Sequence, residues 1–375
     1  TIAPRFGTPS GMQPWQKPET SLAAEYPLSL SVAIVGPLAQ SAISCPSHKI
    51  SMKPGLDELS IILAKGASLD RDFILDMHPQ GVESIGLVAS YLEQRIVALN
   101  FLPPPENSEQ LTEGKNFVMV LDCSGSMAGD SIDQAKEGVR LALMRLKAED
   151  SFAVIGFGST YQCFHEVLLP ANRKNINLAH EFVKNLPDMG GTEMMTALEA
   201  ALGYSTSKDD GIALPVDVLL LTDGEAWGME SIADEAKVDG HRIFTVGIGS
   251  AVSEDVVRTL ADTTGGACEL VTPNENMAQR IERHFLRMRQ PRISSIEINY
   301  GQSADWETRP QRALFAGDSI TIFAAFSEKT PAAIKAKLRY SNQQEREYQI
   351  HVQETDSLGE ALMRVGAQSR LMALD

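Results

Sequence analysis

Oxygen-bearing side chains follow or precede apolar runs at three places in the middle of the chain. The run FVMVL leads into Asp122-Cys123-Ser124-Gly125-Ser126, the segment Gly190-Gly191-Thr192 precedes an apolar helical pattern, and Thr222-Asp223-Gly224 follows the run VDVLLL. Carboxylates and hydroxyls are the ligands that hard cations prefer. A set with so few charges leaves coordination positions for water or for another molecule's oxygen, which favours Mg²⁺ over Ca²⁺. These segments therefore predict a divalent-cation site, provided that the fold brings them together.

Strands and helices alternate from about residue 116 to 290 and would position these segments. The expected strands are NFVMVLD, SFAVIGFGS, CFHEVLL, VDVLLLTDG, RIFTVGIG and ACELV, and the expected helices between them include residues 130–146, EMMTALEAALGYS, ESIADEAKVDG and NENMAQRIERHFLRM. Repeated alternation is typical of an α/β fold with a doubly wound, mostly parallel sheet. In such sheets, ligands bind beyond the carboxyl ends of the strands, where the strand order reverses. Asp122 and Asp223 both come directly after expected strands, so we expect them at that position.

The regions on either side of the α/β segment are rich in β patterns. The opening TIAPRFGTPSGMQPWQKPE is dense in Pro and Gly and is expected to be an irregular arm, and the Pro-rich residues 102–116 are expected to be a linker. We expect the two β-rich regions to form a sandwich-like scaffold into which the α/β segment is inserted. The predicted boundaries are a β-rich region at 1–111, the α/β domain at 112–290, a second β-rich region paired with the first at 291–356, and a C-terminal helix at 357–375.

The composition limits the classes of partner. The chain has 375 residues and a formal net charge of −16. A field of that sign repels phosphate backbones, so nucleic acid is not an expected partner. No stretch is apolar enough to predict a membrane span. The chain begins at Thr1 without a signal peptide, so we expect a fragment or a processed form. The four cysteines show no zinc spacing and are expected to be mostly buried thiols, with one disulfide left open.

The motifs DCSGS, GGT and LTDGE, in this order, resemble the von Willebrand factor type A domain with its metal-ion-dependent adhesion site. The resemblance covers about 112–290. TIAPRFG, DRDFILDMHP and PRISSIEINYG resemble the proteins that combine a VIT domain with an A domain. That group includes the heavy chains of inter-alpha-trypsin inhibitor and bacterial relatives, some of them envelope proteins. The first part of a VIT domain is not matched, so residues 1–111 are expected to hold the end of a VIT-like domain.

The resemblance implies a role for each site residue. Ser124 and Ser126 would ligate the metal through their hydroxyls, and Thr192 would ligate it directly in the ligand-competent state. Asp122 and Asp223 would act directly or through waters. The last coordination position would accept an acidic side chain of a partner protein. The expected metal is Mg²⁺, with Mn²⁺ and Ca²⁺ as alternatives, and the soft thiol of Cys123 is expected to point into the core.

We predict a cation-dependent adhesion or protein-interaction module that binds an Asp or Glu of its partner and has no catalytic activity. The first alternative is a structural assembly subunit whose contacts run through the β regions. The second is a hydrolase, in which Ser124 or Ser126 would need a nearby base, and His165 and His241 are the candidates by sequence. The resemblance favours the cell envelope or the extracellular space, with the cytoplasm left open. The sequence predicts no oligomeric state.

Overall fold

The computed structural model describes most of the chain. The described residues are 29–55, 58–67, 73–79, 81, 83–107, 113–204, 206–207, 213–223, 228–249, 252–271, 276–327, 333–355 and 358–371. The expected irregular arm at the start of the chain, Gly224 and the linker residues 108–112 lie outside these ranges.

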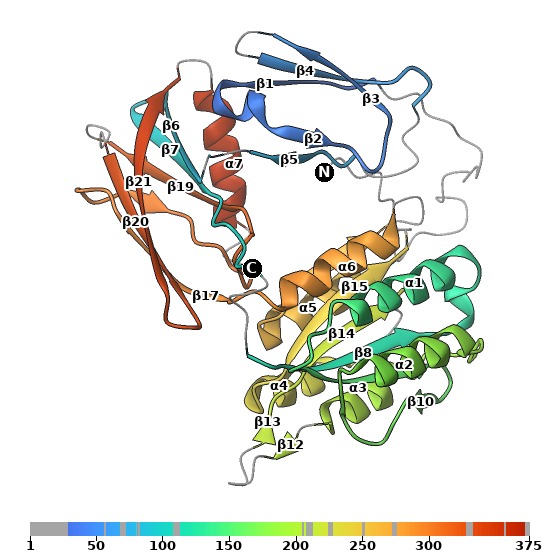
Figure 1. Ribbon diagram of the computed structural model, residues 1–375. Coiled ribbons are helices and arrows are strands. Elements are labelled where there is room, and N and C mark those ends of the chain that lie inside the picture. Colours follow the sequence, from blue (N-terminus) through green and yellow to red (C-terminus); the bar gives the residue numbers. More distant parts are fainter. Residues whose placement is uncertain are drawn as a thin grey trace, which may run out of the picture.

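The middle part of the chain folds into a mostly parallel sheet (Figure 1). Its strand order is β10-β9-β8-β14-β15-β16, and the five strands from β9 to β16 run parallel. Two short antiparallel strands, β10 and β11, pair with β9. The strand bounds are β8 Asn116–Asp122, β9 Ser151–Phe157, β10 Tyr161–Cys163, β11 Leu169–Pro170, β14 Asp217–Thr222, β15 Arg242–Ile248 and β16 Cys268–Val271.

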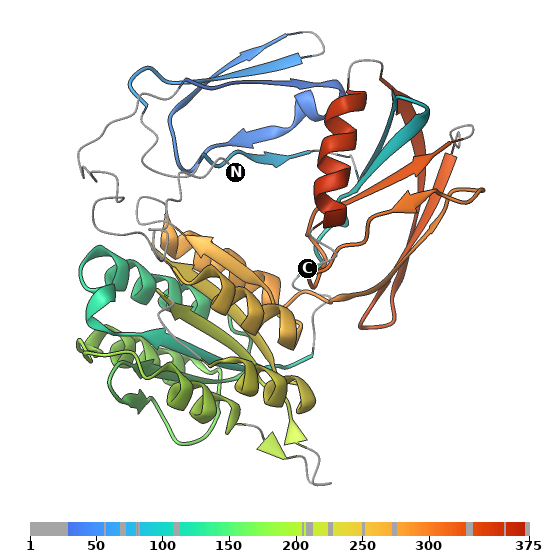
Figure 2. The same ribbon diagram turned by 180° about the vertical axis from the view of Figure 1, so that it is seen from behind.

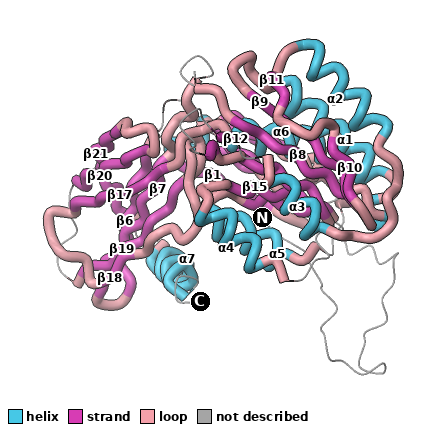
Figure 3. Tube along the Cα trace, turned by 90° about the horizontal axis from the view of Figure 1, so that it is seen from below, coloured by secondary structure: helices cyan, strands magenta, loops and turns pink. Residues whose placement is uncertain are grey.

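Helices cover both faces of this sheet. One face carries α1 Asp130–Met144, α2 Arg173–Asn185 and α6 Met277–Met288; the other carries α3 Met194–Leu202, α4 Glu230–Val238 and α5 Glu254–Thr264 (Figure 3). Strand β8 shows why a continuous apolar run is needed here. Its Phe117, Met119 and Leu121 enter the core on the α1 side, and Val118 and Val120 enter the core on the α3 side. Both faces of a parallel strand are buried in this way when helices cover the sheet.

The expected strand CFHEVLL is wrong. Strand β10 ends at Cys163, although the Phe164 amide still donates to the Val154 carbonyl of β9 at 2.8 Å, and strand pairing resumes only at Leu169. Between them, His165, Glu166 and Val167 are exposed. The Val167 amide donates to Nδ1 of His165 at 3.3 Å, so a local turn replaces the strand here.

The β-rich regions before and after the α/β segment contribute strands to one seven-stranded sheet. Its order is β17-β20-β21-β6-β7-β19-β18. Strand β6 pairs with β21 in parallel, and β7 pairs with β19 antiparallel, so residues 84–101 lie between strands that follow the α/β segment. The bounds are β6 Ser84–Tyr91, β7 Gln94–Phe101, β17 Ile293–Asn299, β18 Trp306–Glu307, β19 Ile320–Phe326, β20 Ala333–Tyr340 and β21 Glu345–Glu354.

The two faces of this sheet are covered differently. One face carries a buried cluster that includes Leu99, Ile322 and Leu338. Helix α7 Gly359–Leu371 lies beside the sheet (Figure 2), and Gly366 of this helix sits against Phe323 and Trp306. A Cβ at position 366 would lie 3.0 Å from the Trp306 ring, so the glycine permits this close approach.

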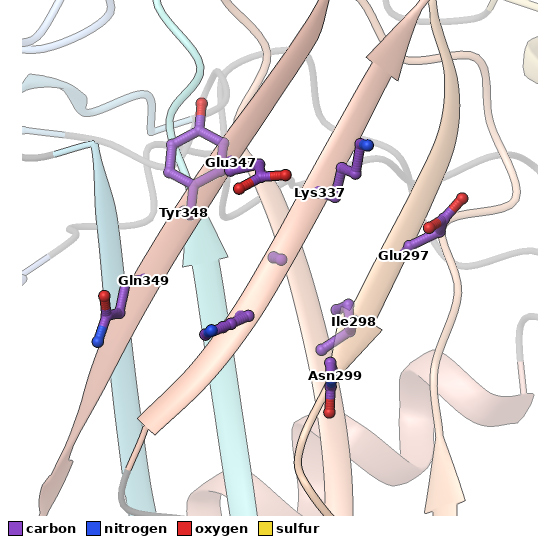
Figure 4. A pocket seen from close by; sticks show the side chains of 9 residues that line it. Glu297, Ile298, Asn299, Lys337, Glu347, Tyr348 and Gln349 are labelled. Atoms are coloured by element: carbon purple, nitrogen blue, oxygen red, sulfur yellow. The ribbon is translucent and has the colours of Figure 1, made fainter.

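A shallow hollow of about 530 Å³ lies on strands β17, β20 and β21. Figure 4 shows Glu297, Lys337 and Glu347 from these three strands. Lys337 is the direct cross-strand neighbour of both glutamates, and it also forms an ion pair with Glu345 at 2.6 Å. Opposite charges in this arrangement stabilise neighbouring strands. We therefore interpret the hollow as part of the sheet's charged surface.

Smaller sheets complete the described structure. Strands β1 Ser31–Val35, β4 Glu58–Leu63 and β3 Ile50–Pro54 form a three-stranded sheet. Two further pairs are β2 Ala42–Ser44 with β5 Asp76–His78, and β12 Thr206–Ser207 with β13 Ala213–Leu214. The two short 3-10 helices in the described part of the chain are η2 Gly36–Gln40 and η3 Gly125–Met127.

The predicted fold class, an α/β domain between β-rich regions, is confirmed. Among the described residues, no helix combines the length and the apolar character that a membrane crossing requires.

Candidate metal centre

The reversal in strand order lies between β8 and β14. From β8 the chain passes through α1 to β9 on one side, whereas β14 lies on the other side of β8 and is followed by β15 and β16. Asp122 is the last residue of β8, and Asp223 directly follows β14. The two carboxylates therefore belong to neighbouring strand ends at the position where open α/β sheets bind ligands.

Asp122 is fully buried and held at both carboxylate oxygens. Its Oδ1 accepts the amide N–H of Ser124 at 2.9 Å, and its Oδ2 accepts the hydroxyl of Thr222 at 2.7 Å. Burial raises the pKa of Asp122 above its ordinary value; the hydrogen bonds oppose this shift, and the charge of Asp223 adds to it. The neighbouring strand end thus contributes to fixing this carboxylate, and a nearby cation would favour its charged form.

The two serines that follow place their hydroxyls side by side. Ser124 Oγ and Ser126 Oγ are 3.0 Å apart. Ser124 is buried, whereas Ser126 is exposed and lies within the short helix η3. The spacing of one residue between the serines therefore gives two convergent oxygen donors directly beyond the buried carboxylate of Asp122.

Backbone hydrogen bonds join the loop before α3 to the loop after β8. The Gly125 amide donates to the Gly190 carbonyl at 2.8 Å, and the Met189 amide donates to the Cys123 carbonyl at 2.8 Å. Gly190 has a φ of +80°, in the left-handed region that favours glycine. Thr192, two residues on, is half-buried. These bonds bring the segment that carries Thr192 against the segment that carries Ser124 and Ser126.

Asp223 carries a buried oxygen with no partner. Its Oδ1 is closed to solvent and accepts no hydrogen bond from the described residues. A buried acceptor without a donor is costly, typically by about 1–3 kcal/mol. A cation bound beside Asp122 and Asp223 would supply the missing interaction, so the donor set fits a hard metal ion.

Thr222 and Ser159 also support the candidate site, and neither was predicted to be a metal ligand. Ser159 Oγ accepts the Gly191 amide at 2.7 Å and so supports the loop before Thr192. Thr222 is level with Asp122 because β14 pairs with β8 in the register Leu221 to Leu121. The apolar run before Thr222 predicts a strand, but only this register reveals the contact.

The other residues singled out from the sequence lie elsewhere. Cys123 is 1% exposed and joins the core on the α1 side, as predicted. All four cysteines lie in described parts of the chain, and none of them forms a disulfide. His241 precedes β15 at the opposite edge of the sheet, where its Nδ1 accepts the Val216 amide at 3.0 Å. His165 lies in the exposed turn between β10 and β11.

The comparisons with known proteins agree with this architecture. Residues 116–284 match the family model of the von Willebrand factor type A domain. A von Willebrand factor A domain-containing protein of Dictyostelium discoideum is 27% identical over 239 residues, which are 62% of this chain and 25% of that protein. The von Willebrand factor A domain-containing protein 5A of Rattus norvegicus is 28% identical over 352 residues, 85% of this chain and 42% of that protein.

Among solved structures, a von Willebrand factor type A protein from Catenulispora acidiphila has a TM-score of 0.47 and 16% identity, covering 90% of this chain and 76% of that one. The chain spans less than half the length of the two curated relatives. The family match coincides with the mostly parallel sheet and the helices on both of its faces. Residues 116–284 therefore match the von Willebrand factor type A domain, and we call this part of the chain the type A domain.

Proposed function

We propose that Asp122, Ser124, Ser126, Thr192 and Asp223 form a metal-ion-dependent adhesion site that binds Mg²⁺ and engages an acidic residue of a partner protein. The unpartnered buried oxygen of Asp223 carries this proposal. It lies next to a strand end where Asp122 is already fixed by Ser124 and Thr222. Type A domains are protein-interaction modules, which is consistent with a site that captures a partner.

The donor set explains why an acidic residue would be attracted. Ser124, Ser126 and Thr192 are neutral ligands, so a divalent cation held mainly by hydroxyls keeps net positive character. A bound metal ion would carry positive charge and leave one coordination position open for a partner's oxygen. Asp122 and Asp223 would offset part of that charge and orient the hydroxyls by accepting their hydrogen bonds. The remaining charge favours a carboxylate from the partner.

We propose no catalytic activity for this site. A serine nucleophile needs a base within hydrogen-bonding distance. His241 lies at the other edge of the sheet and already accepts the Val216 amide. His165 lies in an exposed turn, and its ring nitrogen Nδ1 accepts the Val167 amide. The geometry around Ser124 and Ser126 thus favours binding over hydrolysis.

We further propose that the chain belongs to the group that combines a VIT domain with an A domain. The alignment with the rat protein covers 85% of this chain, so the similarity extends beyond residues 116–284 into the flanking regions. The proposed domains are 1–111, 112–290, 291–356 and the helical segment 357–375. Residues 1–111 would then hold the end of the VIT-like domain and part of the β-rich scaffold.

Partner engagement can be tested with immobilised peptides that differ in one functional group. A peptide presenting a central Asp should retain the protein in Mg²⁺ and release it on addition of EDTA, because the metal would hold the carboxylate. The matched peptide with Asn in place of Asp should not retain it. Retention that is equal for both peptides, or unchanged by EDTA, would contradict the proposal.

A further inference from the structure

A large groove lies at the edge of the type A domain opposite the metal centre. Its volume is about 950 Å³. Its lining comes from the ends of α1 and α6, from the loop before β19 and from residues 105–107, together with Asp76 of β5. Helices α1 and α6 both begin near the carboxyl edge of the sheet, so their last residues lie at the other edge. The groove therefore shares no lining residue with the metal centre.

The lining is richer in cations than the chain as a whole. The net charge of the protein is −16. The groove nevertheless has six basic residues against four acidic ones: Arg145, Lys147, Arg283, Arg287, Arg289 and Arg312 against Asp76, Glu106, Glu269 and Asp318. Glu282 and Asp150 lie outside the lining but pair with Arg145 and Arg289, so the charges around the groove are balanced. The groove thus lacks the acidic excess of the whole chain, which would repel an acidic ligand.

Some of these cations are held by carboxylates of the chain. Arg287 pairs with Asp318 at 2.7 Å, and Arg289 pairs with buried Asp150. Arg145 pairs with Glu282, but 54% of its side chain stays exposed. Arg312 is exposed; its charge acts on Asp262, but it forms no ion pair within 4 Å with any described residue. The groove thus combines cations fixed in its wall with cations open to a ligand.

Polar atoms in the wall also lack partners. His284 and Arg289 are 3% and 4% exposed, and each has a side-chain nitrogen, Nδ1 and Nε respectively, with no hydrogen-bond partner among the described residues. The buried Nε of Arg287 likewise has no hydrogen-bond partner among the described residues. Of these nitrogens only the two of Arg287 and Arg289 are unsatisfied donors, because the His284 ring donates through Nε2 and its Nδ1 is an acceptor.

Apolar side chains make the groove suitable for a peptide. Met144 is 59% exposed and Leu286 is 40% exposed, and both line it. The volume lies near the upper end of the range of about 300–1,000 Å³ typical of ligand pockets, which is more than a lone inorganic anion would fill. We propose that this groove docks an acidic peptide segment of a partner protein. Its carboxylates would meet Arg145 and Arg312, whereas Arg283 stays paired with Asp76 at 3.4 Å. Its apolar residues would cover Met144 and Leu286.

The test uses the full chain in EDTA, so that the metal centre makes no contribution. A fluorescein-labelled peptide of sequence EDLEDLE is titrated with protein and followed by fluorescence anisotropy. We expect saturable binding that weakens as NaCl rises, because the contacts are between opposite charges. The neutral peptide QNLQNLQ, which keeps the apolar positions, should not bind.

Substitutions test whether the peptide binds in the groove. The double variant Arg145→Gln, Arg312→Gln should weaken binding by about tenfold or more, since charge-assisted contacts of this kind are strong. The control is Arg364→Gln, which removes an exposed guanidinium from α7 that is not among the residues lining the groove; it should bind like the wild type. A thermal melt confirms that each variant is folded.

Three results would overturn the proposal: no binding of EDLEDLE, equal binding of the neutral peptide, or unchanged binding by the folded double variant. Saturable binding of inorganic pyrophosphate without binding of the peptide would also overturn it. Because all titrations contain EDTA, none of these results bears on the proposed metal-dependent function.

Discussion

At the residue scale, the arrangement around Asp122 explains why a buried strand ends in an acidic residue followed by two serines. The carboxylate accepts the Ser124 amide and the Thr222 hydroxyl, which fixes its plane. The hydroxyls of Ser124 and Ser126 then converge beyond it. Thr222 is not one of the proposed ligands, yet it positions one of them.

Replacement of Thr222 tests this positioning role. Thr222→Val keeps the shape of the side chain but removes the hydrogen bond to Asp122, so we expect Mg²⁺ affinity to fall by about 10–100-fold. Thr222→Ser retains the hydroxyl and should bind close to wild type. Isothermal calorimetry measures both affinities. Equal affinities for the Val and Ser variants would show that the hydroxyl does not support the site.

At the element scale, helix α6 carries a buried histidine that links its packing to pH. His284 Nε2 donates to the Ala267 carbonyl at 3.1 Å. Burial, with a smaller contribution from the positive charge of Arg287, lowers the pKa of His284 to about 3. The ordinary value is about 6.5. Below pH 6.5 the unfolded chain therefore binds a proton that the folded chain does not, and stability falls as the pH falls.

This difference can be measured by comparing histidine variants. Because His284 takes up a proton on unfolding, the free energy of unfolding should fall by about 1.4 kcal/mol for each pH unit from 6.5 down toward 3. In His284→Gln, which keeps a donor toward Ala267, this part of the slope should vanish. The exposed His165→Gln is the control and should keep the wild-type slope. Urea titrations at several pH values give the free energies; identical slopes for wild type and His284→Gln would contradict the assignment.

The elements differ in how well sequence patterns predict them. Strands β8, β14 and β15 were predictable because helices on both sheet faces require continuous apolar runs. Residues 163–169 misled the prediction because their apolar and aromatic content suits a strand, whereas the His165–Val167 contact makes a turn. The contact between Asp122 and Thr222 depends on which strands are neighbours. Local periodicity carries no information on that order.

At the scale of the whole molecule, the seven-stranded sheet is assembled from distant parts of the sequence. Strands β6 and β7 pair with each other, and they also pair with β21 and β19 from beyond the type A domain. Leu99 and Phe101 are fully buried in the cluster shared with Ile322 and Leu338. Periodicity predicted the β character of these segments, but it could not show which of them would be neighbours across the inserted domain.

Truncation tests this assembly. A chain ending at residue 290 leaves β6 and β7 without both neighbouring strands and exposes Leu99 and Phe101. A two-stranded hairpin alone is marginally stable at best. We expect residues 84–101 to lose protection from hydrogen exchange, while strands β8 and β14 of the type A domain keep theirs and serve as the internal control. Full protection of residues 84–101 in the truncated chain would contradict the shared-sheet account.

The central claim, that the loop after β8 holds a cation, is tested most directly by titrating Mg²⁺ into the EDTA-stripped protein in a calorimeter. Wild type should bind with saturable heat. Asp223→Asn should lose that binding, because it removes the charge of the carboxylate whose Oδ1 is buried without a partner. Asp239→Asn, an exposed change after α4 at the other edge of the sheet, should bind like wild type. No binding by wild type, or equal binding by Asp223→Asn, would contradict the account.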